Sequence, residues 1–306
     1  MAARLPDPCR LKARRSLRRA YRPWCLDGSS PLNCYRAAVD TATIAPDSTV
    51  TRDGTRAPIR ATWLGRVPYR EAWDLQKRLA AARADETIGD CLLLLEHPAV
   101  LTLGRQADEH HVLASPETLA ARGIEVLRVE RGGEVTYHGP GQLVAYPILG
   151  LSRRGLLVRP LVRALEASMV ATCAAAGVQA SRREGHPGCW CNPDGATPRK
   201  IGALGLRVER GVTYHGIALN IAPDLADFDL IDPCGMPGVT STSIAREAGR
   251  PDEAPSTAAV EGAAWTFAAA LAAQLDSQLE RGDKTPTGPT LVLLNVIRRK
   301  GIQTIL

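Results

Sequence analysis

Lysine is scarce in this sequence, with five residues among 306 against 33 arginines. No stretch approaches the ~18 to 20 apolar residues that span a bilayer, and no apolar segment follows the basic N-terminus as a secretory signal requires. We therefore expect a protein that stays inside the cell, in the cytoplasm, without a membrane partner. The eight cysteines fit no disulfide framework in a chain of this length, so most should be free thiols.

Positive charge is concentrated in the first 60 residues, which hold 12 Lys and Arg against 5 Asp and Glu. Residues 61–306 hold 26 against 27 and lack the basic surface that nucleic-acid binding needs. Prolines interrupt this leader, and it has no hydrophobic period, which favours a disordered tail. The alternative is a mitochondrial transit peptide, which would place the protein in mitochondria.

Hydrophobic patterns predict an α+β fold around a mixed, largely antiparallel sheet flanked by helices, because strands come in hairpin-like pairs instead of alternating with helices. Helices are predicted over 69–83, 116–122, 157–176, 244–247 and 255–280. Strands are predicted over 91–95, 100–103, 124–129, 143–149, 189–191, 201–208 and 212–221, with a further β-favouring segment before residue 139. The domain organisation is then a leader (1–60), one compact domain (61–281) and a tail of unassigned role (282–306).

The pentapeptide VTYHG occurs twice, at residues 135–139 and 212–216. Its flanks differ, so it does not mark a domain repeat. We interpret the copies as two strand edges of one sheet, each presenting small residues and a histidine to one cavity. Nearby glycines would let a ligand approach the backbone. Neither GGEVTYHG nor KIGALG matches a phosphate-binding loop, so a nucleotide site is not indicated.

Cys234 lies in DPCGMPG, where the flanking proline and glycine favour a turn that projects the thiol. A buried structural cysteine is the alternative. Lys200 opens the glycine-rich segment KIGALG, either as a solvated side chain or as a functional one. A free thiol has a pKa of ~8.5, and a nearby ammonium would raise its thiolate fraction. Lys200 and Cys234 are therefore a candidate pair of activator and nucleophile.

Cys189 and Cys191, in GCWCNP, raise the question of a metal site. His186 could add a third ligand, but no second cysteine pair stands at the spacing of a zinc site. Free thiols are the better interpretation, and no metal is expected.

Four ordered segments carry a family resemblance: RGGEVTYHGPGQLVAYPI, KIGALGLRV, GVTYHGIALNI and PCGMPGVTS. Together they resemble the lipoyl (octanoyl) transferases of lipoate biosynthesis, which belong with the lipoate- and biotin-protein ligases. The resemblance covers roughly residues 60–280 and includes the 34-residue step from Lys200 to Cys234. It implies the fold of those catalytic domains and a catalytic role for residues 61–281.

The resemblance also implies a reaction without a cofactor. An octanoyl group would pass from acyl carrier protein to Cys234 as a thioester, with Lys200 as the catalytic partner. A lysine of a lipoyl domain would then accept the group as an amide. The acceptors would be subunits of 2-oxoacid dehydrogenases and the glycine cleavage H protein.

By the same resemblance, an acyl channel would be formed by residues of the two glycine-rich segments and the second VTYHG copy. The lining residues would be Arg131, Gly132, Gly133, Glu134, Val135, Thr136, Tyr137, His138, Ala203, Leu204, Gly205, Gly216, Ile217 and Ala218. His138 and His215 would lie near the polar mouth of the channel, with His215 as an auxiliary residue. Cys189 and Cys191 depart from the family pattern and would place an extra thiol near the site.

Three other functions fit parts of this pattern. An ATP-dependent lipoate or biotin ligase would consume ATP and would not need Cys234. An amidotransferase would move octanoyl groups between carrier proteins, and only a test of the donor would distinguish it. A non-catalytic module would hold acyl groups passively, although the pairing of Lys200 with Cys234 argues against it.

Overall fold

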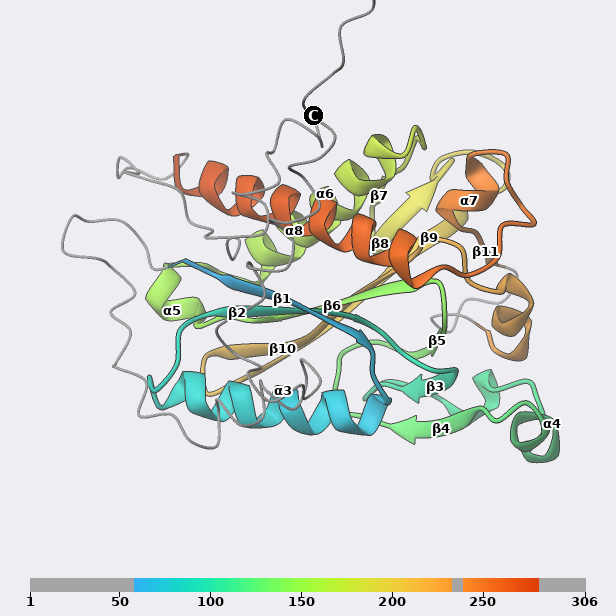
Figure 1. The fold of residues 1–306 in the computed structure, drawn as a ribbon, viewed down its shortest axis with the longest axis horizontal. Coiled ribbons are helices and arrows are strands. Elements are labelled where there is room, and N and C mark those ends of the chain that lie inside the picture. Colours follow the sequence, from blue (N-terminus) through green and yellow to red (C-terminus); the bar gives the residue numbers. More distant parts are fainter. Residues whose placement is uncertain (1–57, 233–238, 281–306) are drawn as a thin grey trace, which may run out of the picture.

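The computed structural model describes residues 58–232 and 239–280, which form two sheets and the helices around them (Figure 1). The predicted tail and almost all of the predicted leader lie outside the described residues, and so does Cys234.

The larger sheet is mixed and largely antiparallel, as the sequence predicts. In pairing order its strands are β1 (Arg60–Arg66), β2 (Cys91–Glu96), β6 (Gln142–Ile148), β10 (Val212–Asn220), β9 (Arg199–Glu209), β8 (His186–Cys191) and β7 (Ser181–Arg183), with β11 (Thr240–Ser241) beside β9. The β1–β2 and β9–β11 pairs are parallel, and the other neighbours are antiparallel.

The smaller sheet consists of β4 (Glu125–Arg128), β3 (Val100–Leu103) and β5 (Val135–His138). The first VTYHG copy begins in β5, and the second begins in β10 of the larger sheet. The expectation that both copies edge one sheet is therefore wrong. The reason is long-range pairing: β5 pairs with β3, whereas β10 lies between β6 and β9.

Helices cover both faces of the larger sheet (Figure 1). The helices of the described residues are α3 (Tyr69–Ala84), α4 (Pro116–Ala121), α5 (Leu151–Arg154), α6 (Val158–Ala175), α7 (Ile244–Glu247) and α8 (Thr257–Glu280), with the 3-10 turns η1 (Glu109–His111) and η2 (Leu225–Leu230). α6 and α8 pack on one face, and α3 packs on the other. All six residues of β2 are buried, as expected for a strand between two helical layers.

The predicted helices and strands are present, with ends that differ by a few residues. The sequence analysis did not predict β1, β7, β11, α5, η1 or η2. These segments are short or, like β1, lack a regular alternation of apolar and polar residues. β1 forms because β2 offers it a buried parallel partner, which is a contact that no local pattern encodes.

Helix α8 contradicts the expectation that no segment could span a bilayer. Residues Thr257–Asp276 have the length and mean hydropathy of a membrane span. In the fold, however, Val260, Phe267 and Leu271 are fully buried against the rest of the domain. This packing accounts for the apolar residues on the buried face of the helix.

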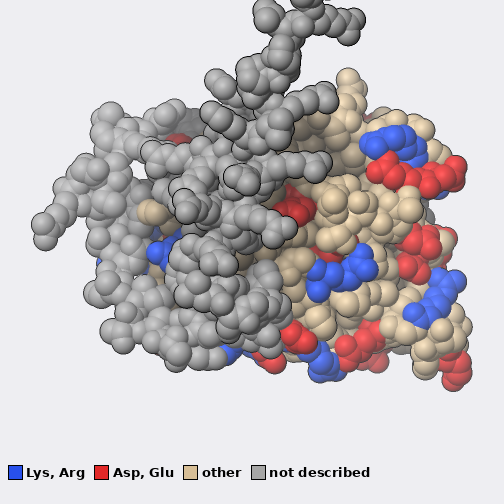
Figure 2. Space-filling model, viewed as in Figure 1, with Lys and Arg blue, Asp and Glu red and all other residues tan. Residues whose placement is uncertain are grey.

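Acidic and basic side chains are interspersed on the surface near α4 and β4 (Figure 2). Arg70 pairs with Glu125, and Arg122 pairs with Asp227. The visible described part of this face therefore carries no extended patch of one sign.

Asp90 is the centre of a buried ionic network between α3 and α5. Its Oδ1 accepts hydrogen bonds from Nε of Arg83 (2.6 Å) and the N–H of Gly150 (2.9 Å), and its Oδ2 accepts from Arg154. The three charged side chains are each at most 4% exposed. Removing the carboxylate would leave two guanidinium groups buried without their counter-ion, which is strongly unfavourable.

We predict that Asp90→Ala lowers the free energy of unfolding by about 3–5 kcal/mol, measured by urea denaturation. Asp85→Ala is the control, because Asp85 pairs with Arg210 while both side chains are more than half exposed. That change should alter stability by less than about 1 kcal/mol. Equal effects of the two changes would contradict the assignment of Asp90 as a central contact.

Candidate active site

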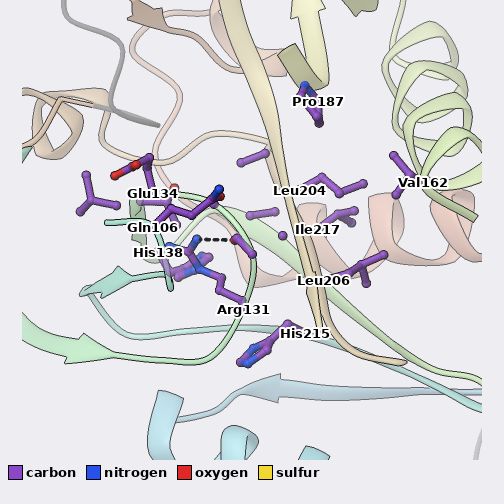
Figure 3. Close-up of a pocket in the computed structure, with 18 of the residues that line it drawn as sticks. Gln106, Arg131, Glu134, His138, Val162, Pro187, Leu204, Leu206, His215 and Ile217 are labelled. Atoms are coloured by element: carbon purple, nitrogen blue, oxygen red, sulfur yellow. Dashed lines mark hydrogen bonds between the residues drawn. The ribbon is translucent and has the colours of Figure 1, made fainter. Parts of the chain in front are cut away.

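A cavity of about 510 Å³ lies between strands β9 and β10 and the turn that precedes β5. It is the site candidate because the glycine-rich segments and both VTYHG histidines converge on it. Figure 3 shows His215 and Pro187 toward opposite ends of the cavity, with Arg131 and His138 between them. Lys200 also lines it, at the beginning of β9.

Small residues face each other across the β9–β10 pair. Gly205 is the partner of Gly216, and Ala203 is the partner of Ala218. A Cβ atom at Gly205 would lie 2.6 Å from the carbonyl oxygen of Gly132. Only glycine therefore lets the turn before β5 pack directly on β9, and the strand pair keeps open volume beneath that turn.

Arg131 holds the turn in place. Its Nη2 donates to the carbonyl oxygen of Thr102 (2.6 Å) and to Oγ1 of Thr102 (3.0 Å). The N–H of Gly132 donates to the carbonyl oxygen of Leu206 (3.0 Å), which ties the turn to β9. The turn is thus bonded to β3 on one side and to β9 on the other, and it closes the cavity.

In the first VTYHG copy, tyrosine and histidine point in opposite directions. The hydroxyl of Tyr137 donates to Asp227 (2.6 Å), and its ring meets Phe228 edge-on, outside the cavity. His138 lines the cavity, and its Nδ1 donates to Oε1 of Gln142 (2.7 Å). This alternation is ordinary for a strand, where successive side chains face opposite sides.

In the second copy, tyrosine and histidine lie together. His215 has a φ of 56°, a left-handed backbone that breaks the alternation of β10. Its ring therefore stacks on Tyr214 at 5.0 Å between centroids. The backbone N–H of His215 donates to Oε1 of Gln76 in α3 (2.8 Å). His215 is 1% exposed, so it is a deep residue and not part of a polar mouth as the sequence analysis expected.

A buried aromatic cluster forms another wall. Nδ1 of His97 donates to the carbonyl oxygen of Val67 (2.7 Å), so its Nε2 accepts from the hydroxyl of Tyr146 (2.8 Å). The ring of Tyr69 lies 4.9 Å from that of His97 and 5.8 Å from that of His138. Tyr69 and Tyr146 line the cavity.

Burial keeps the histidines of this wall neutral near pH 7. Loss of hydration lowers the pKa of His97 to about 4, and it lowers that of His215 to about 3. The pKa of His138 is also well below its usual value, chiefly through burial. These rings act as hydrogen-bonding groups and not as cations.

Lys200 is 7% exposed and approaches the cavity beside Trp190. Its Nζ lies 5.0 Å from the centre of the indole ring, a distance suited to a cation–π contact. Its carbonyl oxygen accepts from the N–H of Thr242, and Ser241 is its partner in the β9–β11 pair. Residues 240–242, which follow the undescribed segment 233–238 closely, therefore lie beside Lys200.

The cysteines of GCWCNP lie in the core and not on the cavity. Cys189 and Cys191 are buried in β8 with Cys173 of α6 nearby, and all three are free thiols. A hydrogen bond that the thiol of Cys189 donates to Cys173, together with burial, raises the pKa of Cys189, and burial raises that of Cys191 to about 12. Among residues 58–232 and 239–280, no group of three or more His, Cys, Asp or Glu side chains could hold a metal ion.

Comparison with known proteins decides the family. Residues 68–262 match the lipoyl protein ligase A/B catalytic domain. The octanoyltransferase of Chloroflexus aurantiacus is 51% identical over 199 residues, which are 65% of this chain and 86% of that protein. The octanoyltransferase of Mycobacterium bovis is 45% identical over 224 residues, 73% of this chain and 90% of that protein.

The chain belongs to the octanoyltransferase family. It is an acyltransferase that acts in protein lipoylation.

The fold agrees with this assignment. A bi-partite lipoate protein ligase of Thermoplasma acidophilum superposes with a TM-score of 0.50 at 14% identity, covering 72% of this chain and 84% of that one. The structure of a putative lipoate protein ligase from the same organism, with bound lipoic acid, has a TM-score of 0.50 at 15% identity, covering 71% and 86%. The α+β fold expected from the resemblance is confirmed.

For this octanoyltransferase, the structure brings together Lys200, His215 and every predicted channel residue except Tyr137. Sequence reasoning missed several lining residues, which are Tyr69, Gln106, Tyr146, Val158, Val162, Gly185, His186, Pro187 and Leu206. Most lie outside the glycine-rich motifs. Tyr69 opens a predicted helix and Tyr146 lies within a predicted strand, so only their tertiary position marks them.

We predict that Gly205→Ala lowers kcat/KM for acyl transfer roughly 10- to 100-fold, because its methyl group would push the turn at Gly132 out of place. The measurement is steady-state transfer of an octanoyl group, with thermal unfolding followed in parallel. Gly262→Ala in α8 is the control, since a Cβ there meets nothing within 4 Å. Normal turnover by Gly205→Ala would show that the turn does not close the channel.

Proposed function

We propose that this octanoyltransferase takes its acyl group from octanoyl-acyl carrier protein and delivers it to a lysine of lipoyl domains. The observation that supports this most directly is the cavity itself, a channel walled by Ala203, Gly205, Gly216 and Ala218 that leads to Lys200. A straight hydrocarbon chain fits a channel that small residues line. An activated acyl donor also needs a nucleophile at the end of the channel where its carbonyl group lies.

Cys234 is the proposed nucleophile. Its thiolate attacks the carbonyl carbon of the donor thioester, the new C–S bond forms, and the thiolate of the carrier leaves. The amine of the acceptor lysine then attacks the same carbon. A C–N bond forms, the bond to Cys234 breaks, and the amine loses a proton. Both steps start from a thioester, so neither requires ATP.

Lys200 is the proposed partner of Cys234. A lysine ammonium beside a thiol favours the thiolate. The acceptor amine must lose a proton during transfer, and a neutral lysine can accept one, whereas an arginine cannot. The buried histidines are poorer candidates for this proton, because burial disfavours their charged forms.

The remaining assignments complete the proposal. Residues 61–281 form the catalytic domain, and the leader and tail lie outside it. The cytoplasm is the proposed compartment, and the acceptors are the lipoyl domains of 2-oxoacid dehydrogenases and the glycine cleavage H protein. Relatives at 45–51% identity are octanoyltransferases, which favours this activity over an ATP-dependent ligase.

We predict that Cys234 carries the acyl group. After incubation with octanoyl-acyl carrier protein, intact-protein mass spectrometry should find one added octanoyl group that hydroxylamine removes. Cys234→Ala should not acquire it. Cys191→Ala is the control and should acquire it normally, because Cys191 is a buried core thiol of raised pKa. An adduct that persists in Cys234→Ala would reassign the nucleophile.

We predict that two changes at Lys200 separate its two roles. Lys200→Ala removes the cation, so Cys234 should react with iodoacetamide only at higher pH, toward the ~8.5 of a free thiol. Lys200→Arg keeps the charge but cannot accept a proton, so the acyl-enzyme should form and then accumulate. Single-turnover mass spectrometry distinguishes slow acylation from slow transfer. If both variants turn over normally, Lys200 has neither role.

A further inference from the structure

His215 presents an unsatisfied imidazole ring to the cavity. Within the described residues, neither Nδ1 nor Nε2 of this buried ring has a hydrogen-bond partner. Nε2 of Gln76, the side chain that binds the backbone of His215, is also buried, and its hydrogen-bonding neighbour among the described residues is the hydroxyl of Tyr146. Buried polar atoms without partners are rare in folded proteins, and two on one ring require an explanation.

The first VTYHG copy shows that this state does not come from the motif. His138 has the same pentapeptide around it and lines the same cavity, yet its Nδ1 is bonded to Gln142. Of the two histidines, only His215 has the left-handed backbone, which places its ring beside those of Tyr214 and Tyr146. The fold therefore leaves the imidazole of His215 available for a hydrogen bond to a bound molecule.

The chemistry of the open groups suits a small neutral molecule. Burial keeps the imidazole neutral, so it offers one donor and one acceptor, and the carboxamide of Gln76 offers further donors. The rings of Tyr214 and Tyr146 flank the imidazole at 5.0 and 6.4 Å. Two to four polar partners in an otherwise enclosed space are what a buried water molecule needs.

The position of His215 relates these groups to the acyl chain. His215 lies opposite Leu206, six residues along β9 from Lys200 and so about 20 Å from it. A lysine side chain reaches roughly 6 Å, and an extended octanoyl group measures roughly 9 Å from carbonyl to methyl, given bond lengths of ~1.5 Å. An eight-carbon chain that starts at Lys200 would end about 5 Å short of His215. Four more carbons would close that gap.

We propose that His215 and Gln76 hold a water molecule at the inner end of the acyl channel and thereby limit the length of the acyl chain. This proposal rests on the proposed function, because it presumes that the acyl group is held on a thiol beside the amine of Lys200. A chain that ends before the water gains apolar contact with each added methylene, about fourfold in affinity. A longer chain must displace the water and set hydrocarbon against the polar atoms of His215 and Gln76, which is unfavourable.

The test is kcat/KM for acyl-carrier thioesters of 6, 8, 10, 12 and 14 carbons. The wild-type enzyme should prefer 8 over 6 carbons and should use 12 carbons at least about tenfold less well than 8. His215→Phe replaces the polar ring with an apolar one and should raise the ratio of 12-carbon to 8-carbon activity at least about tenfold. His215→Asn should keep the low ratio, because asparagine tolerates the positive φ and retains polar atoms.

His138→Phe is the matched control within the same pentapeptide. It leaves Gln142 without its histidine partner, so it should lower activity by a similar factor at every chain length. An unchanged ratio in His215→Phe would overturn the proposal. An equal rise of the 12-carbon to 8-carbon ratio in His215→Asn would also overturn it, because space and not polarity would then limit the chain length.

Two further outcomes keep the test decisive. If His215→Phe does not fold, the wild-type enzyme and His215→Asn still test the proposal. Equal wild-type kcat/KM for 12 and 8 carbons overturns it. A steep fall of wild-type kcat/KM from 8 to 12 carbons, together with a low 12-carbon to 8-carbon ratio in His215→Asn, supports it. Failure of the proposed function would look different: no chain length would be transferred, and no acyl adduct would form on the enzyme.

Discussion

The antiparallel pairing of β9 with β10 is the interaction on which the site depends. Its register sets Gly205 against Gly216 and Ala203 against Ala218, so the surface beneath the turn at Gly132 consists of small residues. A slip of one residue would turn every side chain to the other face. Leu204 and Leu206 would then face the turn at Gly132 in place of Ala203 and Gly205. The same register places Lys200 and His215 toward opposite ends of the cavity, so the length of the channel is a property of this strand pair.

The smaller sheet and its turn complete the enclosure. Arg131 bonds to Thr102 in β3, and the backbone of Gly132 bonds to Leu206 in β9, so the turn is fixed from two sides. Hydrogen bonds within this wall hold His97 and His138 in defined orientations. Neutral histidines are compatible with a hydrocarbon chain, whereas charged imidazolium groups in the same places would oppose its entry.

The two VTYHG copies show how tertiary context changes the use of one short sequence. In β5 the tyrosine packs outward against Phe228, and the histidine alone faces the cavity. In β10 the positive φ of His215 brings histidine and tyrosine to the same side, beside α3. The difference comes from the neighbours of each strand, since β5 pairs with β3 and β10 is bonded to Gln76 at the point of irregularity.

The sequence by itself determined most helices, most strands, the α+β class and the family, because each follows from local periodicity or from ordered motifs. It also identified the cavity residues that lie in the glycine-rich segments and the VTYHG copies, apart from Leu206, but it missed most of those that lie elsewhere. Only the tertiary structure decided that the VTYHG copies belong to different sheets, that Tyr137 points away, and that Tyr69 and Tyr146 line the cavity. Strand pairing joins segments far apart in the chain, and a pattern of neighbouring residues carries no record of which distant strand it will meet. The open imidazole of His215 has the same origin. Among residues 58–232 and 239–280 its ring has no hydrogen-bond partner, because of the left-handed backbone and the position of α3, whereas the histidine of the identical pentapeptide in β5 is bonded to Gln142.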